Sequence, residues 1–320
     1  MTMHRRTLLA AALPAVLAVT IRPARAAEKF SLAVGQKGNW DTSVCEMGMR
    51  SGIFAKRGIA VDILYTQGSG ETLQAVLSRS ADLGIAGGTL GAMGAYAKGA
   101  PLRIIANGTT GAGDLFWYVP ADSPIRSMKD CDGKTIAFST QGSSTNSVVL
   151  GFGPTFGIAP KLVSTGGIPG TYTQVMSGQV DVGWSAAPYN LDAAAQGRIR
   201  IIAQGNDVPE LRTQTIRVNV AHLSVLTGRK SALQEFTRAY RETIDWMYAS
   251  DDAVKTYGDF ASVAPATVQR LRTEFFPKKA IWPDTITGLD GVMADGIRFK
   301  FLQAPLTPQQ LAEIIQIPAA

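Results

Sequence analysis

The sequence predicts an α/β protein of two similar lobes, each a mostly parallel β-sheet flanked by helices. Two observations lead to this prediction. Short apolar strands alternate with helical segments from residue 30 to residue 107, a pattern typical of parallel winding, and the pattern starts again at residue 135. In addition, the segment Leu77–Ala86 matches Met176–Ser185 at an offset of 99 residues, which aligns Asp82 with Asp181 and the two glycines that follow them.

The composition is that of a globular protein large enough for two domains. The chain has 320 residues, of which 46% are hydrophobic and 18% are charged. With only two His and two Cys, it lacks the ligands for a His-rich metal cluster or a disulfide scaffold. Cys45 and Cys131 lie in apolar segments of different lobes, so we expect two buried thiols rather than a disulfide.

Residues 1–26 have the pattern of a signal peptide. The basic pair Arg5-Arg6 precedes an apolar stretch, Leu8–Ile21, and Ala24-Arg25-Ala26 is a cleavage site. Both the Sec and the twin-arginine export routes remain open. Removal of this segment lowers the net charge from +6 to +2 and removes the basic footprint of a nucleic-acid-binding protein. We therefore expect the mature chain in the periplasm, without a nucleic-acid partner.

Each element is predicted from its apolar spacing and from the turn residues beside it. In the first half, we expect strands at 30–34, 59–65, 83–86 and 102–107, with helices at 42–54, at 71–78 and after 89. In the second half, we expect strands at 135–138, 180–184 and 199–203, helices from 147 and at 171–176, and an extended segment at 217–225. The C-terminal part predicts helices at 231–248, 253–260, 265–275, 284–300 and 308–315.

This order of elements places lobe one at residues 27–112 and 218–320, and lobe two at residues 113–217. The expected hinge consists of two crossing segments, 107–114 and 217–221. In open α/β sheets, ligands bind beyond the carboxyl ends of the strands. Two such lobes facing each other would form a cleft.

Several short motifs follow in a fixed order: Gln67–Gly70, Ala81–Gly84, Lys98–Pro101, Asp122–Asp130, Gly133–Ala137, Gln141–Ser144 and Asp181. From residue 28 to residue 250, this arrangement resembles the nitrate/taurine/sulfonate-type substrate-binding proteins of ABC transporters, a group that includes carriers of thiamine pyrimidine precursors. The resemblance implies a two-lobed, type II-like periplasmic binding protein fold and a monomer without catalysis or cofactor. The loaded protein would dock on a cognate permease in the inner membrane.

The strongest candidate for ligand binding is the turn Gln141–Thr145. It follows the first strand of lobe two, and the unpaired N–H groups at a helix start attract anions. Capping of the helix by Ser143 or Ser144 is the alternative role. Trp40 would stack on a ligand or seal the cleft, whereas Trp184 could equally be a core residue. The candidate contacts are Gln36, Lys37, Trp40, Ser69, Gly88, Thr89, Gln141, Gly142, Ser143, Ser144, Thr145, Tyr172, Trp184 and Ser185.

A small anion is the expected ligand: a sulfonate, a taurine-like compound, nitrate or a carboxylate. The proposed cleft contains few Arg and Lys, so turn N–H groups would hold such an anion. A planar aromatic or pyrimidine ligand stays open, because Trp40, Tyr172, Trp184 and Tyr189 offer stacking surfaces. Ala187 stands where relatives often carry Glu, which counts against a zwitterion.

An enzyme is not expected. Thiamine-pyrimidine synthases share the fold but use a His-rich site and a Cys-rich loop, and His222 is the one His outside the signal peptide. A periplasmic protein that reports ligand occupancy to a membrane sensor would share all these features.

Overall fold

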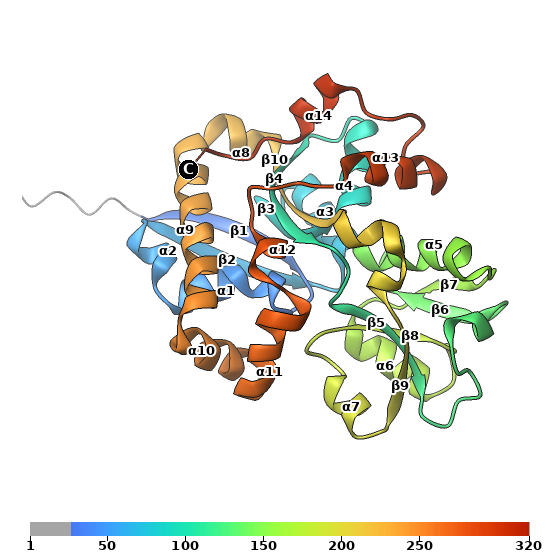
Figure 1. Ribbon diagram of the computed structural model, residues 1–320. Coiled ribbons are helices and arrows are strands. Elements are labelled where there is room, and N and C mark those ends of the chain that lie inside the picture. The colour runs from blue at the N-terminus through green and yellow to red at the C-terminus, as the bar shows by residue number, and fades with distance from the viewer. Residues whose placement is uncertain (1–26, 320) are drawn as a thin grey trace, which may run out of the picture.

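The computed structural model describes residues 27–319, which form two lobes side by side (Figure 1). The predicted signal peptide lies outside the described residues. Figure 1 shows the first lobe with β1–β4, β10 and the C-terminal helices, and the second lobe with β5–β9. The two-lobed α/β fold predicted from the sequence is therefore present.

Lobe one is built on a five-stranded sheet. Its order is β2-β1-β3-β10-β4, with β1 parallel to β2 and β3, and β10 antiparallel to β3 and β4. The strands are β1 (Glu28–Gly35), β2 (Ile59–Thr66), β3 (Leu83–Gly88), β4 (Leu102–Thr110) and β10 (Thr215–His222). β3 and β10 are buried along their whole length, as expected for central strands covered on both faces.

Helices cover both faces of this sheet and form two apolar clusters. In the larger cluster, α9 buries Leu233, Phe236, Tyr240, Ile244 and Met247, spaced three or four residues apart along one helix face. The helices of lobe one are η1 (Asp41–Ser43), α1 (Val44–Arg50), α2 (Ile53–Lys56), α3 (Ser69–Leu77), α4 (Thr89–Ala97), α8 (Leu223–Gly228), α9 (Lys230–Ala249), α10 (Asp251–Ala261), α11 (Pro265–Arg270), η5 (Leu271–Phe275), α12 (Lys278–Ile281), α13 (Leu289–Arg298) and α14 (Pro308–Ile314).

Lobe two has its own apolar core and two smaller sheets, β8-β5-β9 and β6-β7. The strands are β5 (Leu115–Pro120), β6 (Thr135–Phe138), β7 (Lys161–Ser164), β8 (Gly183–Ala186) and β9 (Ile199–Gln204). β6 and β7 are parallel, and a bridge from Ile136 to Val182 joins the two sheets. The helices are η2 (Met128–Cys131), α5 (Ser144–Phe156), α6 (Ile168–Met176), α7 (Leu191–Ala195), η3 (Gly205–Asp207) and η4 (Pro209–Thr213).

The sequence repeat corresponds to a repeated hydrogen-bond network. Asp82 Oδ2 accepts hydrogen bonds from the main-chain N–H and the hydroxyl of Ser31 on β1, and the Asp82 N–H donates back to that hydroxyl. Asp181 makes the same three bonds with Thr135 on β6. Each aspartate thus joins one strand to the turn before another.

The chain crosses between the lobes at residues 111–114, between β4 and β5, and returns after η4. The predicted second hinge at 217–221 is wrong, because these residues lie inside β10 and pair with β3 and β4. In lobe two, β5 runs antiparallel to both β8 and β9, which differs from the mostly parallel sheet predicted for this lobe. Cys45 and Cys131 are buried free thiols, one in each lobe, as expected.

Candidate ligand-binding cleft

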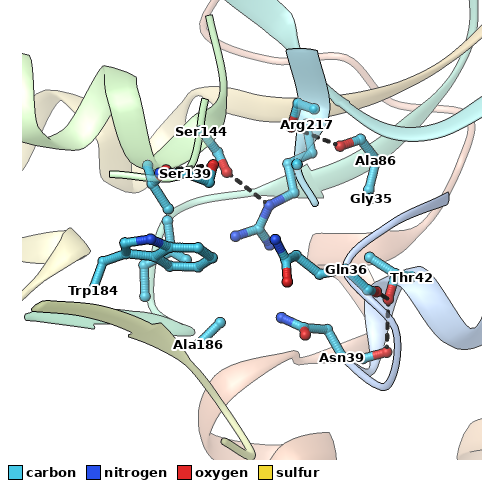
Figure 2. A pocket seen from close by; sticks show the side chains of 14 residues that line it. Gly35, Gln36, Asn39, Thr42, Ala86, Ser139, Ser144, Trp184, Ala186 and Arg217 are labelled. Carbon is cyan, nitrogen blue, oxygen red and sulfur yellow. Dashed lines mark hydrogen bonds between the residues drawn. The ribbon is translucent and has the colours of Figure 1, made fainter. Parts of the chain in front are cut away.

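A cavity lies between the two lobes, beyond the carboxyl ends of β1, β3 and β6 (Figure 2). Its volume of about 30 Å³ leaves room for about two water molecules, which is less than an organic ligand occupies. The lining residues are Gly35, Gln36, Asn39, Thr42, Gly68, Ser69, Ala86, Leu115, Ser139, Ser144, Thr145, Trp184, Ala186 and Arg217.

Arg217 is the central polar residue of the cavity. Its side chain is 7% exposed and projects from β10 between Ser144 and Gln36 (Figure 2). Its Nε donates to Ser144 Oγ over 3.0 Å, while Nη1 donates to Asp41 and Nη2 to Asp114, each over 2.8 Å. Arg217 thereby links both lobes and the first crossing segment.

Asp41, Arg217 and Asp114 form a buried cluster of three charged side chains. Burial raises the pKa of Asp114 to about 6, and Asp41 adds to the rise, although Arg217 opposes it. Burial disfavours the charged guanidinium, but the two carboxylates outweigh burial and raise the pKa of Arg217. With both carboxylates ionised, the three groups carry one net negative charge. Protonation of Asp114 makes them neutral as a set.

The N-terminus of α5 supplies further donors. Ser143 caps the helix by accepting a hydrogen bond from the Asn146 N–H over 3.1 Å, so it performs the capping role. Within residues 27–319, the main-chain N–H groups of Ser144 and Thr145 have no hydrogen-bond partner. Both residues line the cavity, and α5 is thirteen residues long. Free N–H groups at such a helix start attract an anion.

Two lining side chains have unused hydrogen-bonding atoms. Asn39 Oδ1 and Trp184 Nε1 are buried and have no partner in the described part of the chain. The two residues approach the cavity from opposite lobes (Figure 2). An unsatisfied buried polar atom costs about 1–3 kcal/mol, so a ligand that bonds to these atoms would recover that cost.

Outside the cavity, the lobes meet through glycines and a few polar contacts. A Cβ built on Gly88 would lie 2.0 Å from the carbonyl oxygen of Gly142, so only glycine allows this approach. The Gly70 N–H donates to Thr140 Oγ1 over 2.9 Å, and the Tyr189 hydroxyl donates to the Lys37 carbonyl over 2.6 Å.

The structure brings five of the predicted contact residues to the cavity wall: Gln36, Ser69, Ser144, Thr145 and Trp184. Two others belong to the interior of lobe one. Trp40 is fully buried among core aromatics, and its Nε1 donates to the Tyr248 hydroxyl over 3.0 Å. Thr89 donates to the Thr215 carbonyl over 2.7 Å, within the same lobe. Neither residue lines the cavity.

The remaining predicted residues also lie outside the lining. Gly88, Gly142 and Ser143 make the lobe contact and the helix cap described above, and Gln141 is exposed beside them. Ser185 is buried and donates to the Tyr189 carbonyl. The hydroxyl of Tyr172 faces Arg198, and Lys37 lies over the rings of Tyr65 and Phe260. Direct ligand roles for these residues stay predictions.

Sequence reasoning missed Arg217 and Asn39. A recognisable signal existed for Arg217, because a single charged residue inside the apolar segment 215–222 must be paired if it is buried. Its partners Asp41 and Asp114 are 73 residues apart in sequence, so no local spacing connected them. The expected scarcity of cationic groups in the cleft needs correction, because Arg217 lies at its centre.

The family of the chain follows from a sequence comparison. A family model described as "NMT1/THI5 like" matches residues 47–253, which is well over half of the chain. The chain belongs to the NMT1/THI5-like family. No curated protein matches it.

Solved structures share the fold of this NMT1/THI5-like protein. The alkanesulfonate-binding protein SsuA from Xanthomonas axonopodis pv. citri, bound to MOPS, matches with a TM-score of 0.72 and 18% identity over 90% of this chain and 98% of that chain. The periplasmic nitrate-binding protein NrtA from Synechocystis PCC 6803 matches with a TM-score of 0.67 and 14% identity, over 90% of this chain and 85% of that chain. The desulfurization enzyme DSZB matches with a TM-score of 0.60 and 15% identity, over 91% of this chain and 96% of that chain.

Proposed function

We propose that this NMT1/THI5-like protein is the periplasmic substrate-binding component of an ABC importer. It captures a small organic or inorganic anion between its lobes and delivers that anion to a permease in the inner membrane. One observation supports this most strongly: the free N–H groups of α5 and the Arg217 guanidinium face the same buried cavity. SsuA and NrtA, which share the fold, are named for binding an alkanesulfonate and nitrate.

The preference for an anion rests on two donors of different kinds. A helix N-terminus carries a partial positive charge of about half an electron, and burial strengthens its effect on a bound anion. Arg217 adds a full positive charge, which Asp41 and Asp114 hold in place and, when both are ionised, outweigh. The most favourable state for anion binding therefore has a proton on Asp114.

We propose binding rather than catalysis at this site. The cavity lining contains neither His nor Cys, and no group of three potential metal-ligating side chains lies anywhere in residues 27–319. Among those residues, no helix is both long enough and apolar enough to cross a bilayer. Location in the periplasm is proposed from the N-terminal sequence and from the shared fold.

A thermal-shift screen tests this proposal with alkanesulfonates, taurine, nitrate, aromatic carboxylates and pyrimidines. A ligand at 100 times its Kd stabilises the folded protein by about 2.7 kcal/mol, which corresponds to about 4 °C for a chain of this size. We expect at least one anion to produce such a shift. A shift with neutral pyrimidines alone would disprove the anion preference.

A planar ligand is the second candidate, and Trp184 is the observation that favours it. This side chain lines the cavity and has a free indole N–H, so it could stack on a ring or donate to it. In the same screen, a planar neutral ligand would lose its thermal shift in Trp184→Leu and keep it in Ser144→Asp. A small anion would show the reverse pattern.

A further inference from the structure

A second and much larger cavity lies behind the crossing between the lobes. Its volume is about 960 Å³, against about 30 Å³ for the cavity between the lobes. Three segments form its walls: the crossing residues 110–113, residues 206–213 of lobe two, and residues 274–287 of lobe one. Figure 1 shows α12, within the third segment, beside the end of β4. We call this cavity the crossing groove.

The crossing groove is separate from the cavity between the lobes. Gly113 lines the groove, whereas its neighbour Asp114 turns its side chain to Arg217 in the other cavity. The two cavities share no lining residue. A ligand in one would therefore contact different side chains from a ligand in the other.

One wall of the groove is aromatic and firmly held. Phe275 and Trp282 are half-buried and line it together with Pro277. The Asn107 amide on β4 donates to the carbonyls of Ala280 and Trp282 over 2.9 and 3.0 Å, which ties this wall to the central sheet. A preformed concave surface with aromatic walls is typical of a small-molecule site.

The charge of the groove is positive. Within residues 27–319, neither Arg212 nor Lys279 has a carboxylate within 4.0 Å, and the two belong to opposite lobes. Arg212 is positioned by a hydrogen bond from its Nε to the Asn206 carbonyl over 2.7 Å. The other charged lining residues are already paired, Lys278 with Asp245 and Glu274 with Arg270.

We propose that the crossing groove is a second binding site, for an organic anion with an aromatic or apolar body. The body would pack against Phe275 and Trp282, and the acidic group would lie between Arg212 and Lys279. Two contributions would favour binding: the attraction between the acidic group and two unpaired cations, and the burial of apolar surface. This inference does not depend on which ligand the other cavity binds.

The test uses 8-anilinonaphthalene-1-sulfonate, an aromatic sulfonate whose fluorescence rises when it is bound. We expect saturable binding of one molecule to the folded protein. Arg212→Glu and Lys279→Glu should each weaken binding about fivefold, because each replaces an attraction at a partly exposed site by a repulsion. The double variant should weaken dye binding further. Its Tm should equal that of the wild type, which would show that the variant is still folded.

Two control variants distinguish the crossing groove from the general surface and from the cavity between the lobes. Lys98→Glu reverses another exposed lysine without an acidic partner in the described chain, and it should leave the affinity for the dye unchanged. Ser144→Asp alters the cavity between the lobes and should also leave it unchanged. Affinity that falls in Ser144→Asp but not in Arg212→Glu or Lys279→Glu would overturn the proposal. Unsaturable binding, or equal loss in Lys98→Glu, would overturn it as well.

Discussion

Arg217 and Ser144 meet across the cleft, where the Arg217 Nε–H on β10 donates to Ser144 Oγ at the start of α5 over 3.0 Å. The other two nitrogens of the same guanidinium bind Asp41 and Asp114. One side chain therefore joins lobe one, the crossing segment and lobe two. Substitutions at Arg217 must affect folding as well as ligand binding.

Arg217→Met should lower the free energy of unfolding by about 3–5 kcal/mol, because it leaves the Asp41 and Asp114 carboxylates buried without a cation. Urea denaturation measures this loss. A triple variant that adds Asp41→Asn and Asp114→Asn removes the stranded charges and should recover most of the stability. A loss below about 1 kcal/mol in the single variant would show that the carboxylates do not need the arginine.

Ser144→Asp should abolish anion binding while leaving the Tm unchanged. The new carboxylate would lie beside the Arg217 guanidinium and the free N–H groups of α5, where the anion is proposed to bind, and an acidic residue is favourable in a first helical turn. Calorimetric titration with the best anion of the thermal screen measures the loss. Ser144→Ala is the matched control: it removes the hydroxyl without adding a charge, so it should weaken binding far less than Ser144→Asp. Undiminished binding by Ser144→Asp would place the anion elsewhere.

Anion affinity should rise as the pH falls through about 6, because protonation of Asp114 removes a negative charge beside Arg217. The same pKa has a consequence for stability. The folded state binds this proton more tightly than the unfolded chain, whose Asp has a pKa near 3.8, so the Asp114 contribution to stability decreases as the pH rises from about 4 to 6.

Asp114→Asn tests the effect of pH on binding, since it keeps the shape of the side chain and removes the titration. Binding isotherms at several pH values between about 5 and 8 should lose most of their pH dependence in this variant. At a pH of about 7.5, its affinity for the anion should exceed that of wild type. A variant with the wild-type pH profile would assign the titration to another group.

Asp82→Ala and Asp181→Ala should each destabilise the protein by about 2–3 kcal/mol, because each removes the two hydrogen bonds that the aspartate carboxylate accepts. Chemical denaturation compares them with Asp122→Ala, an exposed turn position that should change little. Burial opposes the charge of Asp181, but hydrogen bonds from Thr135 outweigh it and lower its pKa. The stability that Asp181 provides is therefore present at neutral pH and is lost as the pH falls through this lowered pKa.

Gly88→Ala should hold the lobes apart. The added methyl group would lie 2.0 Å from the Gly142 carbonyl, a contact that exists only when the lobes are together. Small-angle scattering should show a larger radius of gyration, and anion affinity should fall. Gly228→Ala is the control, because its Cβ would meet no atom within 4 Å. Equal scattering curves for the two variants would argue against this contact as the limit on closure.

The sequence predicted the fold well because its strongest signals are local. Alternation of strands and helices, the glycine-rich turns and the repeated Asp82 and Asp181 segments all appear within short windows. The crossing was harder to predict. Residues 217–221 looked like an extended linker, and only pairing with β3 and β4, more than 100 residues earlier in the chain, shows them to be a central strand.

The cleft was predicted only in part, for a similar reason. Ser144 and Thr145 could be found because a helix start carries its own sequence pattern. Trp40 has the right place in the chain, directly after a strand and its turn, but its side chain turns inward to Tyr248 and Tyr257. The direction of a side chain in a turn depends on tertiary packing, which spacing does not encode. Arg217 depended on partners in two distant segments.

The repeated networks of Asp82 and Asp181 divide the molecule in a way that bears on its evolution. Each half secures its own turn with its own aspartate, so neither needs the other to fix its local geometry. The cavity lies between these two parts, each of which is stabilised locally by its own aspartate. Substitutions on one side of the cavity can therefore change ligand preference without disturbing the other side. A graft of residues 113–214 from a relative would replace one side of the cavity and leave the Asp82 network of the recipient intact.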